Sequence, residues 1–302
     1  MLLTGAGGFI GRPAVDALLR RGAEVHAVGR GRAPSWLAEG VTWARADLLA
    51  PGAAAALVDR VAPDHVLHLA WETTPGAYWT SPANADWLRA SRELAVSALG
   101  HGRRLVTAGT CAEYDWSGDG WCREGVTALA PTTPYGHAKR DLAAGLEELS
   151  ERLGGSVAHG RIFFVYGPDE APERLVPSVT RSLLRGQRAP TTHGRQRRDF
   201  MHVEDVASAL VALLLADRVT GPVNIASGRP VPVRELISTI ASEVGRPELV
   251  GWGELALGAN EPPLVAADVA RLRDEVGFAP RRGLADGLRE VVDWWRERLA
   301  AR

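Results

Sequence analysis

The amino-acid sequence predicts an α/β fold, in which helices cover both faces of a doubly wound parallel sheet and a smaller α/β region follows toward the C-terminus. Through the first two thirds of the 302 residues, short apolar runs typical of buried strands alternate with amphipathic, helix-like stretches. Strands joined by helices in this way form βαβ units, and these units build a parallel sheet. After Tyr166, prolines and turn residues become denser, which indicates a region made of insertions after the later strands.

Each expected element can be placed on the chain. The runs that predict buried strands lie, in order, at 1–5, 23–29, 65–70, 103–110, 157–167 and 222–227. Helix-like patterns occupy 13–22 and 140–155 between them. Near the end of the chain, apolar side chains recur at helical spacing and predict a closing amphipathic helix over 285–302: Leu288, Val291, Val292, Trp295 and Leu299.

The composition argues against several function classes. The formal net charge is −1 and no segment carries a run of like charges, so we expect neither nucleic acid nor an anionic membrane surface as a partner. The longest apolar run, Val206 to Ala216, is too short for a bilayer, which takes about 20 residues, and the first residues do not read as a signal peptide. A cytoplasmic protein is expected. Cys111 and Cys122 fit neither a disulfide framework nor a paired metal site, so we expect free thiols and no metal.

The segment TGAGGFIG, Thr4 to Gly11, follows the first expected strand and opens the first expected helix. Its glycines permit a tight turn, close approach of the backbone to a pyrophosphate and close packing of helix on strand, while the helix N-terminus faces the negative charge. This context predicts a Rossmann-type dinucleotide domain over 1–166, rejoined by about 196–226, with a substrate-binding domain formed by 167–195 and 227–302. The expected cofactor contacts are Gly5, Gly8, Phe9, Ile10, Gly11, Leu48, Leu69 and Ala70.

The end of the second strand bears on the choice of cofactor. An NAD site usually offers a carboxylate there for the ribose 2′-hydroxyl, whereas an arginine can neutralise a 2′-phosphate. The chain has Gly29-Arg30-Gly31-Arg32 and no acid, so Arg30 favours NADPH, with a solvated loop arginine as the alternative. Asp47, after the next short strand, is a candidate contact for the adenine amino group or a helix cap.

Lys139 is the only lysine in the chain, and it lies four residues after Tyr135. Thr133 and Pro134 form a cap followed by a proline at the first helical position, so Tyr135 and Lys139 should share one face of the helix. A phenol is a poor acid or base at neutral pH, but a neighbouring ammonium favours the phenolate. We therefore expect a tuned proton donor and acceptor, in which Lys139 also reaches ribose hydroxyls of the cofactor.

Thr110 ends the strand 103–110 and so lies at the carboxyl edge of the expected sheet, where doubly wound folds bind ligands. Its hydroxyl can hydrogen-bond a substrate carbonyl while Tyr135 supplies a proton. Trp71 follows the strand 65–70 and is expected at the same edge, where its flat ring could cover the apolar face of a bound substrate.

These motifs, together with RIFFVYGP (161–168), RRDFMHVEDVA (197–207) and VNIASG (223–228), resemble the extended short-chain dehydrogenase/reductases that act on nucleotide sugars. The resemblance covers nearly the whole chain. It implies that Thr110, Tyr135 and Lys139 are catalytic, that the glycine loop holds the cofactor, and that Arg198 contacts the substrate diphosphate. A salt bridge from Arg198 to Asp199 or Glu204 is the alternative. Members of the family commonly pair through a helix bundle, so a homodimer is expected.

Departures from the family pattern narrow the expected reaction. Dehydratases of this kind place an Asp-Glu pair directly after the threonine, whereas this chain has Cys111 and Ala112 and so lacks those proton carriers. Cys111 is expected to be a small buried thiol beside the substrate. The segments HLAWETTPGAYW and GTCAEYDWSGDGWC resemble the reductases of nucleotide-linked 4-keto-6-deoxyhexoses. We therefore expect NADPH-dependent reduction at C4; a 4-epimerase with tightly bound NAD and a non-catalytic dinucleotide-sensing module are the alternatives.

Overall fold

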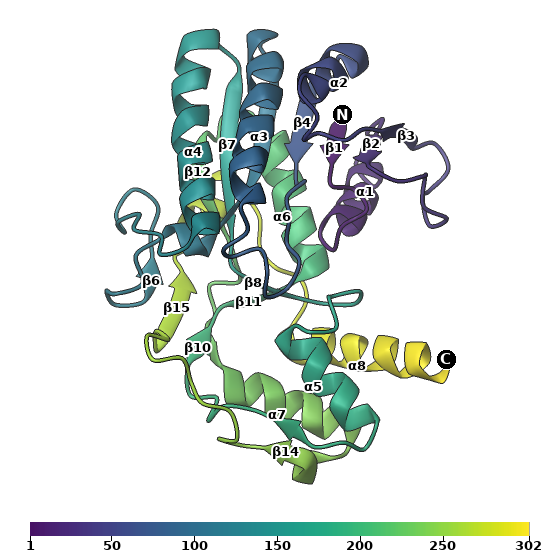
Figure 1. The fold of residues 1–302 in the computed structure, drawn as a ribbon, viewed down its shortest axis with the longest axis vertical. Coiled ribbons are helices and arrows are strands. Elements are labelled where there is room, and N and C mark those ends of the chain that lie inside the picture. Colours follow the sequence, from purple (N-terminus) through teal and green to yellow (C-terminus); the bar gives the residue numbers. More distant parts are fainter. Residues whose placement is uncertain (302) are drawn as a thin grey trace.

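The computed structural model describes residues 1–301, and its centre is a seven-stranded sheet in which every neighbouring pair is parallel. Figure 1 shows the sheet with its helices in the upper part of the molecule. In spatial order the strands are β12 (Gly221–Ile225), β7 (Ser156–Ile162), β5 (Arg104–Thr110), β4 (His65–His68), β1 (Leu2–Thr4), β2 (His26–Gly29) and β3 (Thr42–Arg45). The chain runs outward from β1 in both directions, which confirms the doubly wound, Rossmann-type sheet and creates a switch point between β1 and β4.

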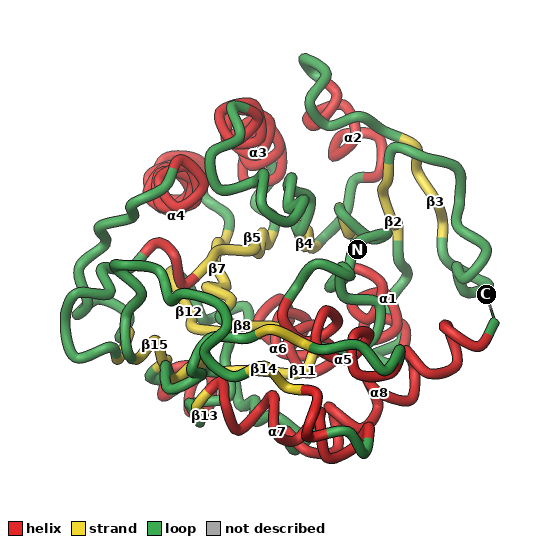
Figure 2. Tube along the Cα trace, turned by 60° about the horizontal axis from the view of Figure 1, so that its bottom comes forward, coloured by secondary structure: helices red, strands yellow, loops and turns green. Residues whose placement is uncertain are grey.

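Helices cover both faces of this sheet, as Figure 2 shows. One face packs against α1 (Gly11–Leu19) and α6 (Val203–Leu215), and the other against α2 (Ala53–Val61), α3 (Ala83–Gly100) and α4 (Pro134–Leu153). The apolar run that begins at Val206 is part of α6. This helix carries apolar side chains on nearly all of its sides, and it is therefore buried against the sheet. Within residues 1–301, we find no helix with the length and hydropathy that a membrane span requires.

A second group of helices packs below the carboxyl edge of the sheet (Figure 1). We call α5 (Leu175–Leu184), α7 (Val233–Val244) and α8 (Leu284–Ala300) the helical lobe, because their apolar faces form one core. The helix predicted over 285–302 corresponds to α8, in which Leu288, Val291 and Val292 are buried. Residue 302 lies outside the described residues.

Short strands and turns join the sheet to the helical lobe. One small sheet consists, in spatial order, of the strands β13 (Val231–Pro232), β10 (Arg197–Arg198), β15 (Leu264–Ala267) and β6 (Trp121–Cys122). The pair β13–β10 is antiparallel and the other two pairs are parallel. Two further pairs are β11 (Phe200–His202) with β8 (Phe164–Tyr166), and β14 (Val250–Gly251) with β9 (Ala189–Pro190). Single-turn helices occupy η1 (Cys111–Glu113), η2 (Pro247–Leu249) and η3 (Arg271–Glu275). Through β6, the segment after β5 pairs with β15, a contact that apolar patterning did not predict.

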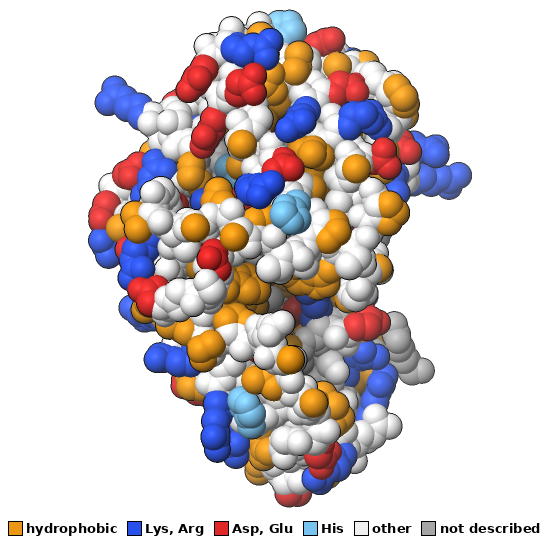
Figure 3. All heavy atoms as spheres, turned by 60° about the vertical axis from the view of Figure 1, so that its left-hand side comes forward, with side chains coloured by type: hydrophobic (Ala, Val, Ile, Leu, Met, Phe, Trp, Pro, Cys, Tyr) orange, Lys and Arg blue, Asp and Glu red, His pale blue; other side chains and the backbone are white. Residues whose placement is uncertain are grey.

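On the face drawn in Figure 3, positive and negative side chains are interspersed rather than gathered by sign. This distribution agrees with the near-neutral net charge of the chain.

Candidate active site

A cavity of about 850 Å³ lies between the carboxyl edge of the sheet and the helical lobe. Its wall combines the glycine loop after β1, the ends of β2, β4 and β5, the start of α4, and residues from α5 and β10. This is the edge at which parallel sheets bind ligands, and the volume is of the size that small-molecule sites occupy.

The glycine loop is shaped by two positions that exclude a side chain. Gly5 has φ +72°, and a Cβ there would lie 2.7 Å from the backbone nitrogen of Ala70. At Gly11, the first residue of α1, a Cβ would lie 2.0 Å from the carbonyl oxygen of Gly5. Gly7, by contrast, has open space around it. The loop therefore packs closely against β4 and α1 while its middle presents bare backbone, as a pyrophosphate cradle requires.

Nearly all of the residues predicted to contact the cofactor line this cavity. Asp47 is the exception: it is absent from the cavity wall, and its carboxylate instead accepts a hydrogen bond from the backbone N–H of Leu49 at 3.2 Å. The adenine contact expected of Asp47 stays a prediction, and the role that the structure shows is this local turn bond. The residues that do line the cavity are Gly5, Gly8, Phe9, Ile10, Gly11, Arg30, Leu48, Leu69, Ala70, Tyr135 and Lys139.

Tyr135 and Lys139 lie together on the cavity side of α4. The helix begins as predicted, because Thr133 caps it by accepting from the N–H of Gly136 at 3.1 Å and Pro134 occupies the first turn. Both side chains are buried, and both line the cavity with Thr110. The ammonium of Lys139 donates to the carbonyl oxygen of Ala108 at 2.7 Å, which fixes it against β5.

Aromatic rings enclose this pair. The rings of Trp71, Tyr78 and Trp79 meet the Tyr135 ring edge to face, with centroids 6.4, 4.9 and 5.6 Å away. The Lys139 ammonium lies 3.7 Å from the centroid of the Trp71 ring, a cation–π contact. Trp71 is itself anchored, since its indole N–H donates to the Asn84 side chain at 2.9 Å. The predicted sheet-edge tryptophan thus lies in the cavity wall beside the catalytic candidates.

Burial governs the protonation of the pair. It raises the pKa of Tyr135 above its ordinary value, with smaller raising effects from Tyr78 and Glu113, while a hydrogen bond with Thr110 lowers it. Burial lowers the pKa of Lys139 to about 7, against a smaller raising effect from Glu113. The raised pKa of Tyr135 is the opposite of the lowering expected from the neighbouring lysine, because loss of hydration on burial is its largest cause. At neutral pH Tyr135 holds its proton and can donate it.

The predicted substrate contacts also reach the cavity. Cys111 is a buried free thiol whose pKa is raised by burial, so it keeps its proton. Arg198 lines the cavity, but its guanidinium donates to the carbonyl oxygen of Pro262 at 2.8 Å and pairs with the carboxylate of Glu261. The partners Asp199 and Glu204 offered as alternatives are wrong; Asp199 instead accepts from backbone N–H groups at 227 and 228.

Two cavity residues escaped the sequence analysis, because their segment, 167–175, was treated only as turns. Glu170 is 8% exposed, and one of its carboxyl oxygens is buried without a hydrogen-bond partner. Burial raises the pKa of Glu170 to about 8, against a smaller lowering effect of Arg174. The Arg174 guanidinium lies 5.2 Å from the ring of Tyr78. The sequence did offer one signal for these residues: an acid between two prolines and an arginine shortly after them follow the end of a predicted strand.

A metal-binding arrangement is not found in the described part of the chain. No group of three or more His, Cys, Asp or Glu side chains comes together there in a way that could hold an ion.

Comparison with known proteins shows which family the chain belongs to. Residues 1–226 match the model of the NAD dependent epimerase/dehydratase family. The chain belongs to this family. The resemblance to extended short-chain dehydrogenase/reductases is thereby confirmed.

Relatives of known activity align along the whole chain. A dTDP-glucose 4,6-dehydratase of Streptomyces antibioticus is 30% identical over 99% of this chain and 93% of its own length. The dTDP-6-deoxy-L-talose 4-dehydrogenase (NAD(P)(+)) of Kitasatospora kifunensis is 30% identical, over 95% of this chain and 92% of its own. Among solved structures, MoeE5 in complex with UDP-glucuronic acid and NAD superposes with a TM-score of 0.82 at 30% identity, covering 98% of this chain and 99% of that one.

Proposed function

We propose that the protein uses NADPH to reduce the 4-keto group of a nucleotide-linked 4-keto-6-deoxysugar. The observation that carries this proposal is the joint presence of Thr110, Tyr135 and Lys139 in one cavity with the glycine loop. Relatives named for dTDP-sugars and a structural neighbour holding UDP-glucuronic acid and NAD support the substrate and cofactor classes. Glycine-loop backbone, Arg30 and Lys139 would hold the dinucleotide, which supplies the hydride when bound.

The side chains divide the remaining work. Tyr135 gives its proton to the oxygen at C4 as the hydride arrives at the carbon, so that the ketone becomes a hydroxyl. The hydroxyl oxygen of Thr110 accepts from the N–H of Ala112 at 3.2 Å, and its proton, which now hydrogen-bonds Tyr135, would turn to the same substrate oxygen. Lys139 then lies one helical turn away to attract the tyrosinate as it forms and to bond the nicotinamide ribose.

Reduction is favoured over dehydration by the residues after Thr110. Elimination of water needs an acid and a base beside the sugar, and the chain has Cys111 and Ala112 there. Because burial raises the pKa of the Cys111 thiol, that residue is a poor base at neutral pH. The protein therefore shares the hydride chemistry of its dehydratase relatives without their proton carriers.

A 4-epimerase with tightly held NAD is the second candidate, and one observation favours it. The positive charge of Arg30 lowers the pKa of Glu72, although hydrogen bonds from Thr74 lower it more. Glu72, in the segment after β4, is thus a carboxylate within electrostatic range of Arg30 at the end of β2. If it offsets the charge of Arg30, the preference for a 2′-phosphate weakens.

One assay separates the candidates. Purified protein is incubated with NADPH, or with NADH, and a panel of nucleotide-linked 4-keto-6-deoxysugars, and the fall in reduced cofactor is followed with product analysis by NMR. Consumption of NADPH with a new C4 hydroxyl supports the reductase. Co-purified NAD with no consumption supports the epimerase, and cofactor binding without turnover of any substrate revives the non-catalytic module. In Arg30→Ala, the ratio of kcat/KM for NADPH to that for NADH should fall by about 10-fold or more.

We also propose that residues 1–166 with 196–226 form the cofactor domain, and that 167–195 with 227–302, including the helical lobe, form the substrate domain. Trp71, Cys111 and Arg198 would then contact the sugar and its diphosphate from the shared cavity wall. A homodimer is proposed from the family resemblance, and light scattering coupled to gel filtration tests it.

A further inference from the structure

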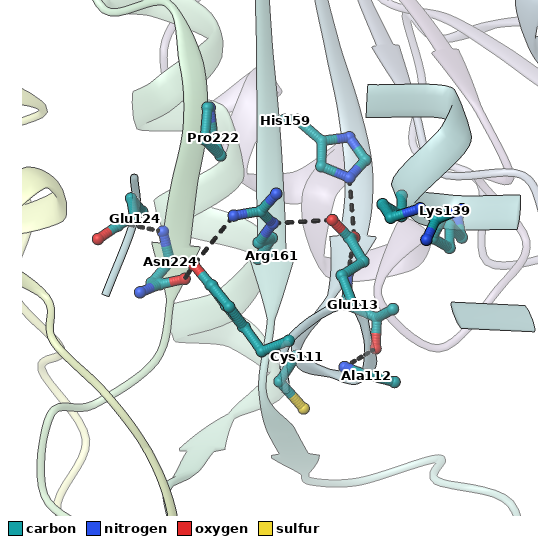
Figure 4. Close-up of polar contacts among 12 residues, drawn as sticks. Cys111, Ala112, Glu113, Glu124, Lys139, His159, Arg161, Pro222 and Asn224 are labelled. Carbon is teal, nitrogen blue, oxygen red and sulfur yellow. Dashed lines mark hydrogen bonds and ion pairs between the residues drawn. The ribbon is translucent and has the colours of Figure 1, made fainter. Parts of the chain in front are cut away.

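Directly behind the end of β5, a buried carboxylate ties three strands together. Glu113, with no exposed surface, ends η1, and Figure 4 shows His159 and Arg161 of β7 converging on its carboxylate. His159 Nε2 donates to Oε1 at 2.9 Å, and Arg161 Nε donates to Oε2 at 2.7 Å. Arg161 also donates to the hydroxyl of Tyr114 at 3.1 Å, and that hydroxyl donates to Asn224 of β12 at 2.8 Å.

The same carboxylate holds the backbone of Thr110. Oε1 of Glu113 accepts from the N–H of Thr110 at 2.8 Å, while the Thr110 hydroxyl accepts from the N–H of Ala112. These two bonds form a capping box around the turn from β5 into η1. The position and direction of the Thr110 hydroxyl therefore depend on where Glu113 is held.

The strand β5 has a glycine, Gly109, where the ion pair of Glu113 and His159 lies against it. A Cβ at Gly109 would lie 2.2 Å from Nε2 of His159 and 2.7 Å from Oε1 of Glu113. The strand thus carries a glycine beside Thr110 where the acid and the histidine need the space. A buried ion pair contributes little net stability compared with apolar side chains of the same volume, so stability alone gives little reason for such a cluster.

The charge of Glu113 reaches the rest of the site. Burial alone would raise its pKa, but His159 and Arg161, with the N–H of Thr110, lower the pKa of Glu113 to about 2, so it is ionised at neutral pH. The carboxylate raises the pKa of Tyr135 and that of Lys139. It therefore favours the protonated states of both groups.

We propose that Glu113 is a positioning residue of the reaction: clamped by His159 and Arg161, it aims the Thr110 hydroxyl at the substrate oxygen. The proposal rests on the proposed function in one respect, that Thr110 acts on that oxygen. It adds a residue that touches neither substrate nor cofactor, together with the two β7 side chains that keep it ionised and in place.

The kinetic test is a double-mutant cycle between Glu113→Gln and Thr110→Val. Glu113→Gln should lower kcat on the order of 10- to 100-fold while the KM for NADPH changes by less than about 3-fold, since only the geometry of the reacting atoms is disturbed. In the Thr110→Val background the same change should cost less than about 3-fold, because the hydroxyl that it aims is gone. If the double variant instead loses kcat by the product of the two single losses, the two residues act independently and the proposal is overturned.

Arg104→Met is the matched control. Arg104 is another buried cation, at the opposite end of β5, where it donates to the carbonyl oxygens of Leu213 and Val219 at 2.8 Å each. Its removal should lower the free energy of unfolding but leave kcat within about 2-fold when assayed below the unfolding transition. An equal loss of kcat in Arg104→Met would mean that any buried charge on β5 has this effect, and the proposal would fail.

A second readout needs no turnover. Because Lys139 is the only lysine in the chain, protein made with 13Cε-lysine gives one signal whose shift reports its pKa. Glu113→Gln should lower that pKa, and an unchanged value would refute the charge effect. The other titratable groups that face Lys139 and Tyr135 are unaltered in this variant: His68 from β4, Tyr78 from the segment before α3, and Cys111 from η1.

These two readouts separate the proposals. A wild type inactive on every keto sugar overturns the proposed reaction, while the lysine signal still tests the effect of Glu113. If Glu113→Gln does not fold, His159→Leu replaces it, since leucine has no N–H to donate and the Glu113 carboxylate is kept. A loss of about 3-fold in kcat that disappears in the Thr110→Val background supports the proposal, and an equal loss in both backgrounds overturns it.

Discussion

Replacing Lys139 by Met should change how the stability of the ligand-free protein depends on pH. Burial lowers the pKa of Lys139 to about 7 from 10.5, so between these values the unfolded chain binds a proton that the folded protein does not. Each pH unit of such a difference adds about 1.4 kcal/mol to the free energy of unfolding as pH rises. Between pH 7 and pH 9 the unfolded chain holds this extra proton over the equivalent of nearly two pH units. Lys139 should therefore make the wild type about 2.5 kcal/mol more stable at pH 9 than at pH 6, by a contribution that is lost as pH falls.

Glu170 works in the opposite direction. Burial raises its pKa from 4.5 to about 8, so the folded protein binds the extra proton, and stability is lost as pH rises through this range. From pH 6 to pH 8 that loss is about 2.5 kcal/mol. The two contributions nearly cancel in the wild type. Removing one side chain should therefore reveal the pH dependence that the other one causes: stability falls with pH in Lys139→Met and rises with pH in Glu170→Gln.

Urea unfolding at pH 6, 7, 8 and 9 measures both effects. The difference between each variant and the wild type isolates the altered group, because all other titrating groups are shared. Arg140→Met is the control, since it removes the neighbouring cation of α4, a half-buried guanidinium that pairs with Asp141 at 2.7 Å. If the curves of Lys139→Met and wild type run parallel, the lysine titrates alike in both states and the burial reasoning is refuted.

Three further predictions concern the site. Tyr135→Phe should lower kcat by at least about 100-fold while the Kd for NADPH, measured by calorimetry, changes by less than about 3-fold, since only the proton donor is lost; wild-type turnover would remove Tyr135 from the mechanism. Gly11→Ala should abolish cofactor binding or unfold the protein, whereas Gly7→Ala, with open space at its Cβ, should bind NADPH and unfold like the wild type; equal melting temperatures and affinities for the two variants would contradict the packing argument. Cys111→Ser should retain at least about one third of kcat, because the thiol carries no proton in the reaction; a loss comparable with that of Tyr135→Phe would show that it does.

Local patterns predicted those parts of the site that depend on neighbours in sequence. The cap at Thr133 and the spacing of Tyr135 and Lys139 fix one helical face, and the strand ends fix one sheet edge, so the cavity could be anticipated. The protonation of Tyr135 could not, because burial by Tyr78 and Trp79 comes from packing that no spacing reveals.

Long-range ion pairs were also beyond the sequence. Glu113 pairs with Arg161, 48 positions away in the sequence, and Arg198 pairs with Glu261, 63 positions away. Neither pair could be predicted from neighbouring residues. Only the two positions directly after Thr110 were expected to matter, whereas the acid that contacts Thr110 is the third residue, Glu113, which closes a capping box on it. The pairing of β6 with β15 escaped for the same reason, since strands of two residues carry no period.

The indole rings around the cavity give the protein an optical reporter of its own. Four of its ten tryptophans, Trp71, Trp79, Trp87 and Trp116, stand in the cavity wall. Reduced nicotinamide absorbs light in the region where indole emits, so a dinucleotide seated among them should quench the native fluorescence by energy transfer. Occupancy could then be followed in stopped flow without any dye, and each ring exchanged for phenylalanine would show how much of the signal it contributes.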